Sequence, residues 1–177
     1  MMKSVLLLFF LAAALSSIGQ KYKATESHIR FFSDAPIEDI AATNEDAISI
    51  MDLETGNIVF SVPIKGFTFE KSLMQEHFNE NYLESDKYPK CIFLGKLSTT
   101  DLKDGENMVS ASGTLDLHGV KREVTFEGSL VKEDQNFKVT SVFTVLLKDY
   151  KIKIPRALFH NIAEEIEVTV NFTYGPN

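Results

Sequence analysis

The four histidines are the side chains best suited to hold a metal ion or to move a proton, and they are scattered. They are His28, His77, His118 and His160. No two of them stand in a His-x-His or His-Glu-x-x-His pattern, the spacings that bring two imidazoles onto one ion. We therefore expect no metal site. His118 is interpreted as a turn residue and His77 as a helix residue.

Nucleophilic catalysis has no better support. Ser112 lacks the Gly-x-Ser-x-Gly surroundings of a nucleophile elbow. The acidic run at residues 164–167 is interpreted as the solvated start of a strand. Asp149 and Tyr150 have two interpretations, a polar contact to a ligand head group or a turn with one packed aromatic ring. We expect no catalytic residues and no cofactor.

Cysteine content and charge exclude further classes. Cys91 is the only cysteine, so no intramolecular disulfide can form, and it is interpreted as a small buried hydrophobe rather than a reactive thiol. The formal net charge of −7 argues against nucleic acid and against electrostatic docking on anionic lipid.

Residues 1–19 have the three-part pattern of a secretory signal peptide. Lys3 precedes an apolar run from Val5 to Leu15, and the small residues Ser17 and Gly19 follow it. The run is too short for a comfortable membrane span, and no cysteine follows it as a lipoprotein attachment point. We expect cleavage near Gly19 and a periplasmic or secreted protein without a stable membrane anchor.

Cleavage would leave residues 20–177 as one domain of 177 − 19 = 158 residues. Loss of Lys3 would change the formal charge from −7 to −8. A domain of this size buries about 70% of the surface of its unfolded chain, which is enough for a real core.

A β-hairpin dominates the middle of this domain. In residues 107–117 and 120–131, apolar and polar side chains alternate with the period of half-buried strands. His118 and Gly119 supply the turn between them. The apolar face holds three small residues, Ala111, Gly113 and Gly128, which either leave room inside a curled sheet or only relieve crowding and bend it.

Strands are predicted almost throughout the rest of the chain, mostly joined by short turns. Residues 36–44 are expected to be a connector. The eight predicted strands cover residues 21–33, 47–53, 57–64, 91–100, 107–117, 120–132, 137–148 and 166–174.

One segment, residues 70–83, breaks this pattern. It places five residues on one helical stripe: Leu73, Met74, His77, Phe78 and Tyr82. Pro89 forbids continuation beyond the next few residues. Consecutive hairpins favour a closed up-and-down barrel with this short amphipathic helix over a sandwich, since closure removes exposed edges.

A barrel of about eight strands is just wide enough to be filled by its own side chains or to hold one slim ligand. The inward positions of the clear strands and the helix stripe give the candidate ligand-binding residues, for each of which ordinary core packing remains an alternative. They are Phe60, Val62, Leu73, Phe78, Tyr82, Phe93, Val109, Ala111, Gly113, Leu115, Phe126, Gly128, Phe143 and Val145.

The chain also resembles the YceI-like family of exported proteins. The run GTLDLHGVKREV at 113–124 is similar to the hallmark hairpin of that family. Residues 74–93, 148–155 and the closing IEVTVNF resemble its helix and Tyr-Pro loop, its late turn and its last strand. Lys151 stands where family members often carry glycine, which leaves the turn there uncertain. The resemblance implies an all-β, extended, eight-stranded antiparallel lipocalin-like barrel that holds a long isoprenoid lipid or similar amphiphile.

Three functions stay open at this point. The first is non-catalytic binding, transport or storage of such a lipid, which a continuous apolar cavity would favour. The second is a ligand-free structural or stress-related interaction module, which a filled interior would favour. The third is a small enzyme acting on an apolar substrate, which an ionisable residue buried at the end of a cavity would favour. A homodimer also stays open.

Overall fold

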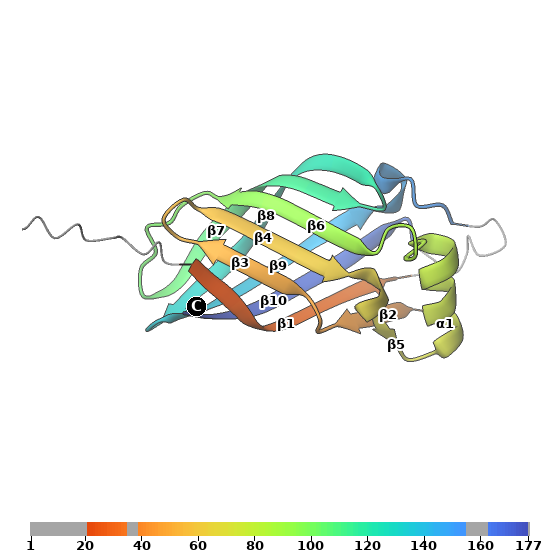
Figure 1. Cartoon of the computed structure of the whole chain (residues 1–177), viewed down its shortest axis with the longest axis horizontal. Coiled ribbons are helices and arrows are strands. Elements are labelled where there is room, and N and C mark those ends of the chain that lie inside the picture. Colours follow the sequence, from red (N-terminus) through yellow and green to blue (C-terminus); the bar gives the residue numbers. More distant parts are fainter. Residues whose placement is uncertain (1–20, 35–38, 155–162, 177) are drawn as a thin grey trace, which may run out of the picture.

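The computed structural model describes residues 21–34, 39–154 and 163–176. The predicted signal peptide and His160 lie outside these residues. Ten antiparallel strands form one sheet (Figure 1). They are β1 (Lys21–Ser33), β2 (Ile40–Asn44), β3 (Ile48–Asp52), β4 (Asn57–Pro63), β5 (Thr68–Phe69), β6 (Lys90–Leu97), β7 (Gly105–Leu117), β8 (Val120–Glu133), β9 (Asn136–Leu146) and β10 (Glu165–Pro176).

Eight of these strands close into a barrel. The sheet order is β10-β9-β8-β7-β6-β4-β3-β1-β2-β5, and β1 also pairs with β10 from Tyr22–Pro176 to Phe32–Glu167. The ring therefore contains β1, β3, β4 and β6 to β10, which are the eight predicted strands. The prediction of an eight-stranded antiparallel barrel is confirmed.

Strand β2 was missed by the sequence analysis, which treats residues 36–44 as a connector. β1 is long enough to hold two partners along one edge: Lys21–Lys23 pairs with β3, and Ile29–Ser33 pairs with β2. β2 in turn pairs with the two-residue strand β5. The open edge of β1, rather than any alternation in the short segment IAATN, makes this segment a strand.

The predicted helix is present and lies across one end of the barrel (Figure 1). It consists of α1 (Ser72–His77) followed by one π-helical turn, η2 (Phe78–Tyr82). Two short 3-10 helices, η1 (Ile64–Gly66) and η3 (Leu147–Tyr150), follow β4 and β9. Among the described residues, we find no helix that combines the length and the apolar character needed to cross a bilayer.

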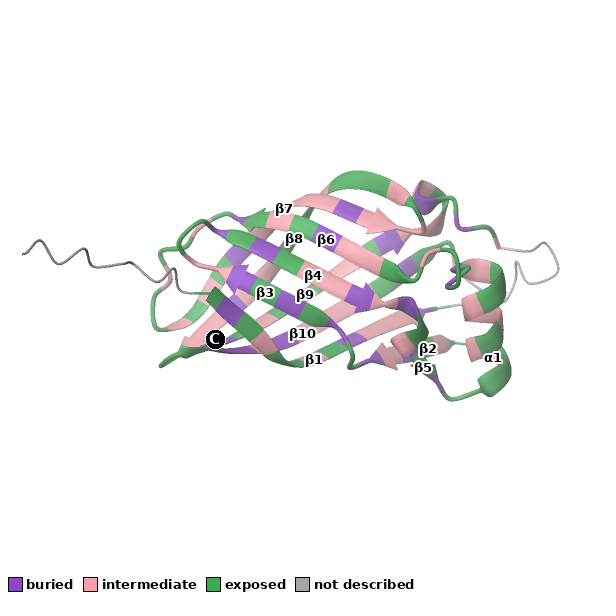
Figure 2. Cartoon of the chain, viewed as in Figure 1, coloured by how far each residue is buried: buried purple, intermediate pink, exposed green. Residues whose placement is uncertain are grey.

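The hairpin of β7 and β8 has the predicted turn. The strands pair from Gly105–Lys132 to Leu117–Val120, and buried and exposed residues alternate along the strands of the barrel (Figure 2). His118 and Gly119 both have positive φ, 53° and 71°. An added Cβ on Gly119 would lie 2.5 Å from the ring of Tyr88, so a glycine is needed here for space as well as for φ.

The barrel interior is densely packed at the end opposite the helix. Met51, Leu130 and Tyr174 have no exposed surface there. The hydroxyl of Tyr174 lies 2.6 Å from Ser49 Oγ, which itself donates to the carbonyl oxygen of Val59 at 2.8 Å. Since the single hydroxyl proton of Ser49 is used on Val59, Tyr174 is the donor to Ser49. This end of the barrel is a floor of interlocked side chains.

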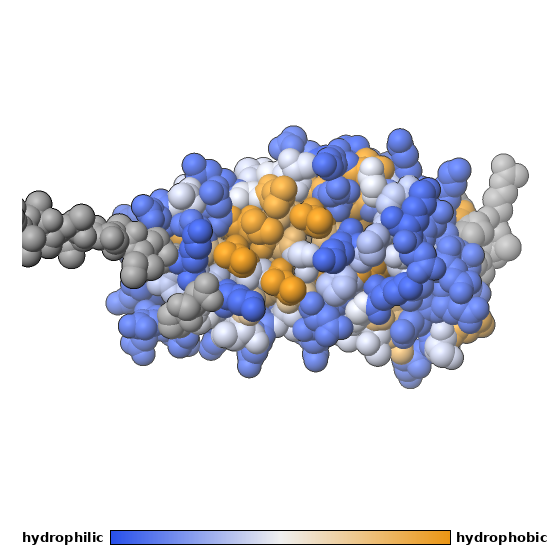
Figure 3. Space-filling model, viewed as in Figure 1, coloured by the Kyte–Doolittle hydropathy of each residue, from blue (hydrophilic) through white to orange (hydrophobic). Residues whose placement is uncertain are grey.

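One apolar patch lies on the outer face of the barrel. Ile50 pairs with Val59, Val59 pairs with Leu94, and all three side chains point outwards together with Ile48. Figure 3 shows an orange patch over β3, β4 and β6 on a mostly blue surface.

Candidate functional site

A cavity of about 310 Å³ occupies the half of the barrel that lies towards the helix. Its walls are almost entirely aliphatic and aromatic. All the predicted lining residues except Leu73 and Gly113 line it: Phe60, Val62, Phe78, Tyr82, Phe93, Val109, Ala111, Leu115, Phe126, Gly128, Phe143 and Val145. Binding pockets for small molecules measure about 300–1,000 Å³ and are mostly apolar, so this cavity falls within their range.

Leu73 is a correction to the predicted site. Its side chain is 60% exposed and lies outside the cavity. It occupies the first turn of α1. Met74, which belongs to the same predicted stripe, does line the cavity and is followed at four-residue intervals by Phe78 and Tyr82. The inward stripe of the helix therefore begins at Met74.

Gly113 is the second correction. It pairs with Gly95 across β6 and β7, and an added Cβ would lie 2.1 Å from the carbonyl oxygen of Leu94. An added Cβ on Gly95 would lie 2.3 Å from the ring of Phe93. These glycines let the backbone of the next strand and an aromatic ring approach closely, so the small residue at position 113 leaves no room for a ligand.

Ala111 and Gly128 both line the cavity, but they differ from each other in the space beside them. An added Cβ on Gly128 would lie 2.5 Å from the carbonyl oxygen of Thr140. Gly128 is therefore also a point of close backbone approach. Among the three small residues of the central hairpin, Ala111 is the one that fits the expectation of space inside the sheet.

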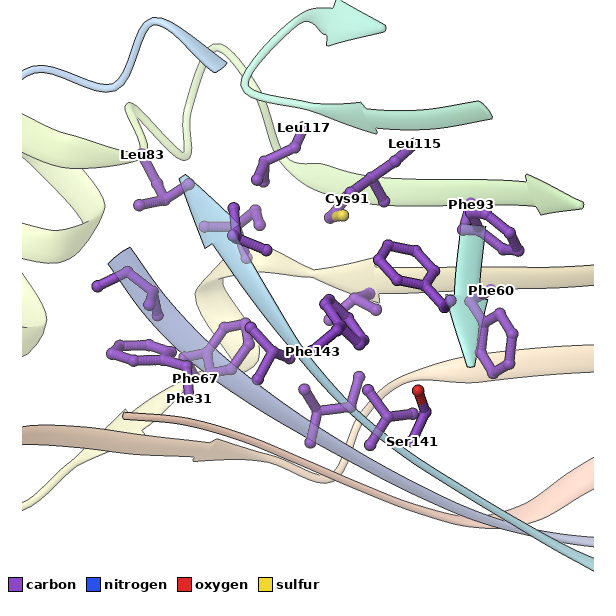
Figure 4. Close-up of a pocket in the computed structure, with 18 of the residues that line it drawn as sticks. Phe31, Phe60, Phe67, Leu83, Cys91, Phe93, Leu115, Leu117, Ser141 and Phe143 are labelled. Atoms are coloured by element: carbon purple, nitrogen blue, oxygen red, sulfur yellow. The ribbon is translucent and has the colours of Figure 1, made fainter. Parts of the chain in front are cut away.

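Several lining residues were not predicted. Phe31, Phe67 and Phe69 come from β1, the residue after η1, and β5, and all three rings contact Phe78 of the helix. Figure 4 shows Phe31 beside Phe67. Phe78 stacks on Phe31 with ring centroids 5.5 Å apart and contacts Phe69 at 5.0 Å. Aromatic pairs at such distances stabilise packing beyond area burial alone. These four rings close the helix end of the cavity.

Phe31 lies where the alternation of β1 is weak, and Phe67 and Phe69 lie outside the predicted strands. Further unpredicted lining residues come mainly from strands β1, β2, β9 and β10 and include Ile29, Ile40, Val139, Val168 and Val170.

Polar groups touch the cavity at two places. His77, Tyr82 and Ser33 border it near the helix, where burial raises the pKa of the Tyr82 phenol and Ser33 Oγ accepts from the backbone N–H of Ala163 at 2.9 Å. A second group of polar residues lies on β8 and β9, at Glu127, Ser129 and Ser141. The long apolar wall between them suits a chain-like molecule with one polar end.

Cys91 lines the cavity, as its interpretation as a buried hydrophobe predicts (Figure 4). Burial, with a smaller contribution from the negative charge of Asp116, raises the pKa of its thiol from an ordinary value near 9 to about 12. The thiolate is the reactive form, so Cys91 is inert at neutral pH.

His118 lies outside the cavity, at the tip of the β7–β8 hairpin. Its Nδ1 lies 3.0 Å from the carbonyl oxygen of Tyr150, and its Nε2 lies 3.0 Å from Glu84 Oε2. The Tyr88 ring packs edge-on against it at 4.5 Å. His118 therefore joins the hairpin tip to the segment after η2 and to η3. It is the turn residue that was predicted, and it also makes these tertiary contacts.

The remaining candidates for chemistry stay apart. Ser112 Oγ lies 2.9 Å from Thr125 Oγ1 on the outer face of the hairpin, and His28 forms an exposed contact with Glu45. Within residues 21–34, 39–154 and 163–176, no three His, Cys, Asp or Glu side chains are grouped to hold a metal ion.

A model of the YceI-like domain matches residues 21–174. The chain belongs to the YceI-like family. The resemblance of the central hairpin, the helix and loop and the closing strand is thereby confirmed. Lys151, which stands where family members often carry glycine, has a left-handed backbone conformation with φ 56° and ψ 23°. Its N–H donates to the carbonyl oxygen of Lys148.

Solved structures share this fold at low sequence identity. A polyisoprenoid-binding domain from Saccharophagus degradans has a TM-score of 0.78 at 15% identity, and the match covers 90% of this chain and 99% of that one. BcnA from Burkholderia cenocepacia has a TM-score of 0.71 at 12% identity, with 83% and 95% covered. A YceI protein from Campylobacter jejuni has a TM-score of 0.57 at 13% identity, with 75% and 80% covered. No curated protein sequence matches the chain.

Proposed function

We propose that this YceI-like protein binds a long-chain isoprenoid or similar amphiphilic lipid inside its barrel, without catalysing a reaction. The observation that carries the proposal is the apolar cavity of about 310 Å³, enclosed by Phe60, Phe93, Phe126 and Phe143 in its middle and by the helix at one end. Transfer of apolar surface from water into such a cavity provides about 25 cal/mol per Å². A molecule of isoprene units offers that surface along its whole length.

The comparisons support a binding role. The family is that of the YceI-like domain, and one neighbour with the same fold is described as a polyisoprenoid-binding domain. The cavity also favours binding over a ligand-free structural module, since such a module would gain packing energy from a filled interior. An enzyme would need a positioned acid, base or nucleophile against the substrate, and the described polar residues around the cavity offer only His77, Tyr82, Ser33, Glu127, Ser129 and Ser141 in two separate groups.

The proposal includes export. Residues 1–19 carry the sequence pattern of a signal peptide, so a periplasmic or secreted carrier of 158 residues is expected. The intact mass of protein recovered from the exported fraction should lack these residues. Full-length protein recovered only from membranes would contradict this part of the proposal.

The ligand itself is tested by extraction. Protein purified without detergent should release a stoichiometric isoprenoid or similar amphiphile into organic solvent, identified by mass spectrometry. Protein denatured and refolded before extraction is the control, because it should have lost the lipid. Equal amounts of lipid from native and refolded protein, or none from either and no uptake of added isoprenoid alcohols, would refute the proposal.

Ala111→Phe tests whether the lipid occupies the cavity. Ala111 lines the cavity and is paired with Leu97 on β6 and with Phe126 on β8. The new ring should therefore enter the space of the ligand. We expect lost lipid retention with a melting temperature close to that of the wild type. Undiminished lipid in a folded Ala111→Phe protein would place the ligand elsewhere.

A further inference from the structure

The hydrogen-bonded ladder between β8 and β9 stops halfway. Its last pair is Gly128 with Ser141, although β8 begins at Val120 and β9 runs on to Leu146. Beyond that pair, β8 is held only by β7 and β9 only by β10, as far as the described strands show. The barrel wall is therefore open along part of this seam.

Two aromatic rings fill the start of the opening. Phe126 and Phe143 approach with ring centroids 4.0 Å apart, and both line the cavity. The cavity also reaches Glu127 and Ser129, whose side chains alternate with that of Gly128 and therefore point to the outer face of the strand. The interior and the outer surface meet at this place.

The opening has fixed ends, so it is a slot rather than a frayed edge. At the ladder end, Ser141 Oγ donates to the carbonyl oxygen of Glu127 at 2.6 Å. At the hairpin end, Arg122 pairs with Asp149 at 3.4 Å, next to the contact between His118 and Tyr150. The first contact links β8 to β9, and the second links β8 to η3, which follows β9.

We propose that the polar end of the bound lipid reaches solvent through this slot, and that Glu127 favours an uncharged polar end group over a phosphate. This rests on the proposed lipid-binding function. Ser129 offers a hydroxyl at the rim, and Ser141 Oγ, whose proton is donated to the carbonyl oxygen of Glu127, can still accept a hydrogen bond. The carboxylate of Glu127 repels an anion there. Arg122 and Lys132, the two cations nearest to Glu127 along β8, are paired with Asp149 and Asp104. The competing position for the polar end is the helix end, beside His77 and Tyr82.

A spin-labelled lipid distinguishes the two positions. The probe is geranylgeraniol with a nitroxide attached at its alcohol end, and the readout is paramagnetic broadening of backbone amide signals. We expect the strongest broadening at Glu127, Ser129 and Val142. Strongest broadening at Met74, His77 and Tyr82 would overturn the slot while leaving the lipid-binding function intact. Failure of the probe, and of unlabelled geranylgeraniol, to bind at all would refute both.

Charge reversal tests the role of Glu127. Wild-type protein should bind geranylgeraniol more tightly than geranylgeranyl monophosphate. Glu127→Lys should tighten monophosphate binding by about five-fold or more at low ionic strength, with little change for the alcohol. Glu54→Lys, in the exposed turn between β3 and β4, makes the same change in net charge away from the slot and is the matched control. An unchanged Glu127→Lys preference, or an equal shift in Glu54→Lys, would overturn the selection by Glu127.

Discussion

His118 Nδ1 lies 3.0 Å from the carbonyl oxygen of Tyr150, which joins the tip of the β7–β8 hairpin to η3. The His118 side chain is only 9% exposed and also contacts Glu84 and the ring of Tyr88. His118→Ala should therefore lower the free energy of unfolding by about 1–3 kcal/mol, because it leaves the carbonyl oxygen of the buried residue Tyr150 without this hydrogen bond. Urea titration measures the loss. His28→Ala, which removes an exposed histidine, is the control and should change stability by less than about 0.5 kcal/mol.

Gly113 and Ala111 should respond in opposite ways to added bulk. Gly113→Ala places a methyl group against the backbone of Leu94 and should cost about 1–3 kcal/mol of stability. Ala111→Leu extends into the cavity and should leave the melting temperature of lipid-free protein unchanged or slightly raised. Thermal unfolding followed by circular dichroism compares the two. Equal destabilisation by both would mean that the interior beside Ala111 has no free space.

Phe78→Ala should affect the lipid more than the fold. The Phe78 ring closes the helix end of the cavity but remains partly exposed, so the stability loss should stay below the roughly 3–5 kcal/mol of a fully buried phenylalanine. Lipid retained through purification should fall markedly. Leu73→Ala is the matched control on the same helix, because Leu73 is 60% exposed and faces away from the cavity. Equal lipid retention in Phe78→Ala and wild type would remove the helix from the binding site.

Stability should fall in alkali through Cys91. Burial raises the pKa of its thiol from near 9 to about 12, so the unfolded chain loses this proton first as the pH rises. The contribution of Cys91 is complete below about pH 9 and is lost between about pH 9 and pH 12. At pH 10 the wild type should have lost about 1–1.5 kcal/mol more than Cys91→Ala, relative to each protein at pH 8. Denaturant titrations at both pH values test this, and identical pH dependence would contradict the burial of the thiol.

Lys151→Gly should stabilise the protein. Lys151 has φ 56°, a left-handed conformation that a side chain disfavours, and it ends η3. Glycine adopts it without strain, so a gain of about 0.5–1 kcal/mol is expected after the entropic cost of glycine. Lys148→Gly, within the same short helix, is the control and should destabilise. A loss of stability in Lys151→Gly would show that the lysine side chain contributes more than the strain it causes.

The sequence predicts the barrel well because alternation is a local signal. Each of β7 and β8 carries an inward and an outward face over more than ten residues, and the His118–Gly119 turn fixes their register. β2 was missed because a five-residue segment becomes a strand only when the edge of β1 is beside it. Local pattern contains no information on such a partner.

The candidate site was predicted less completely, for reasons of the same kind. The alternation of inward and outward positions along a strand identifies Phe60 and Phe126 as lining residues. It cannot distinguish a glycine that leaves space from a glycine that another backbone approaches closely, as at Gly113. Nor can it show where a ladder ends. The pairing of β8 with β9 stops at Gly128 and Ser141 although both strands keep their alternation beyond that point, so the slot has no signature in sequence.

The packed floor of the barrel has a consequence for ligand length. Met51, Leu130 and Tyr174 are fully buried in packed protein and lie outside the cavity, so the interior is a blind tube. A lipid with more isoprene units cannot extend past these three residues, because the closely packed floor has no free volume for it. Every added unit must instead be exposed to water at the open side, at a cost of about 25 cal/mol per Å² of apolar surface. The affinity of the barrel for a lipid should therefore rise with chain length until the cavity is full and then level off.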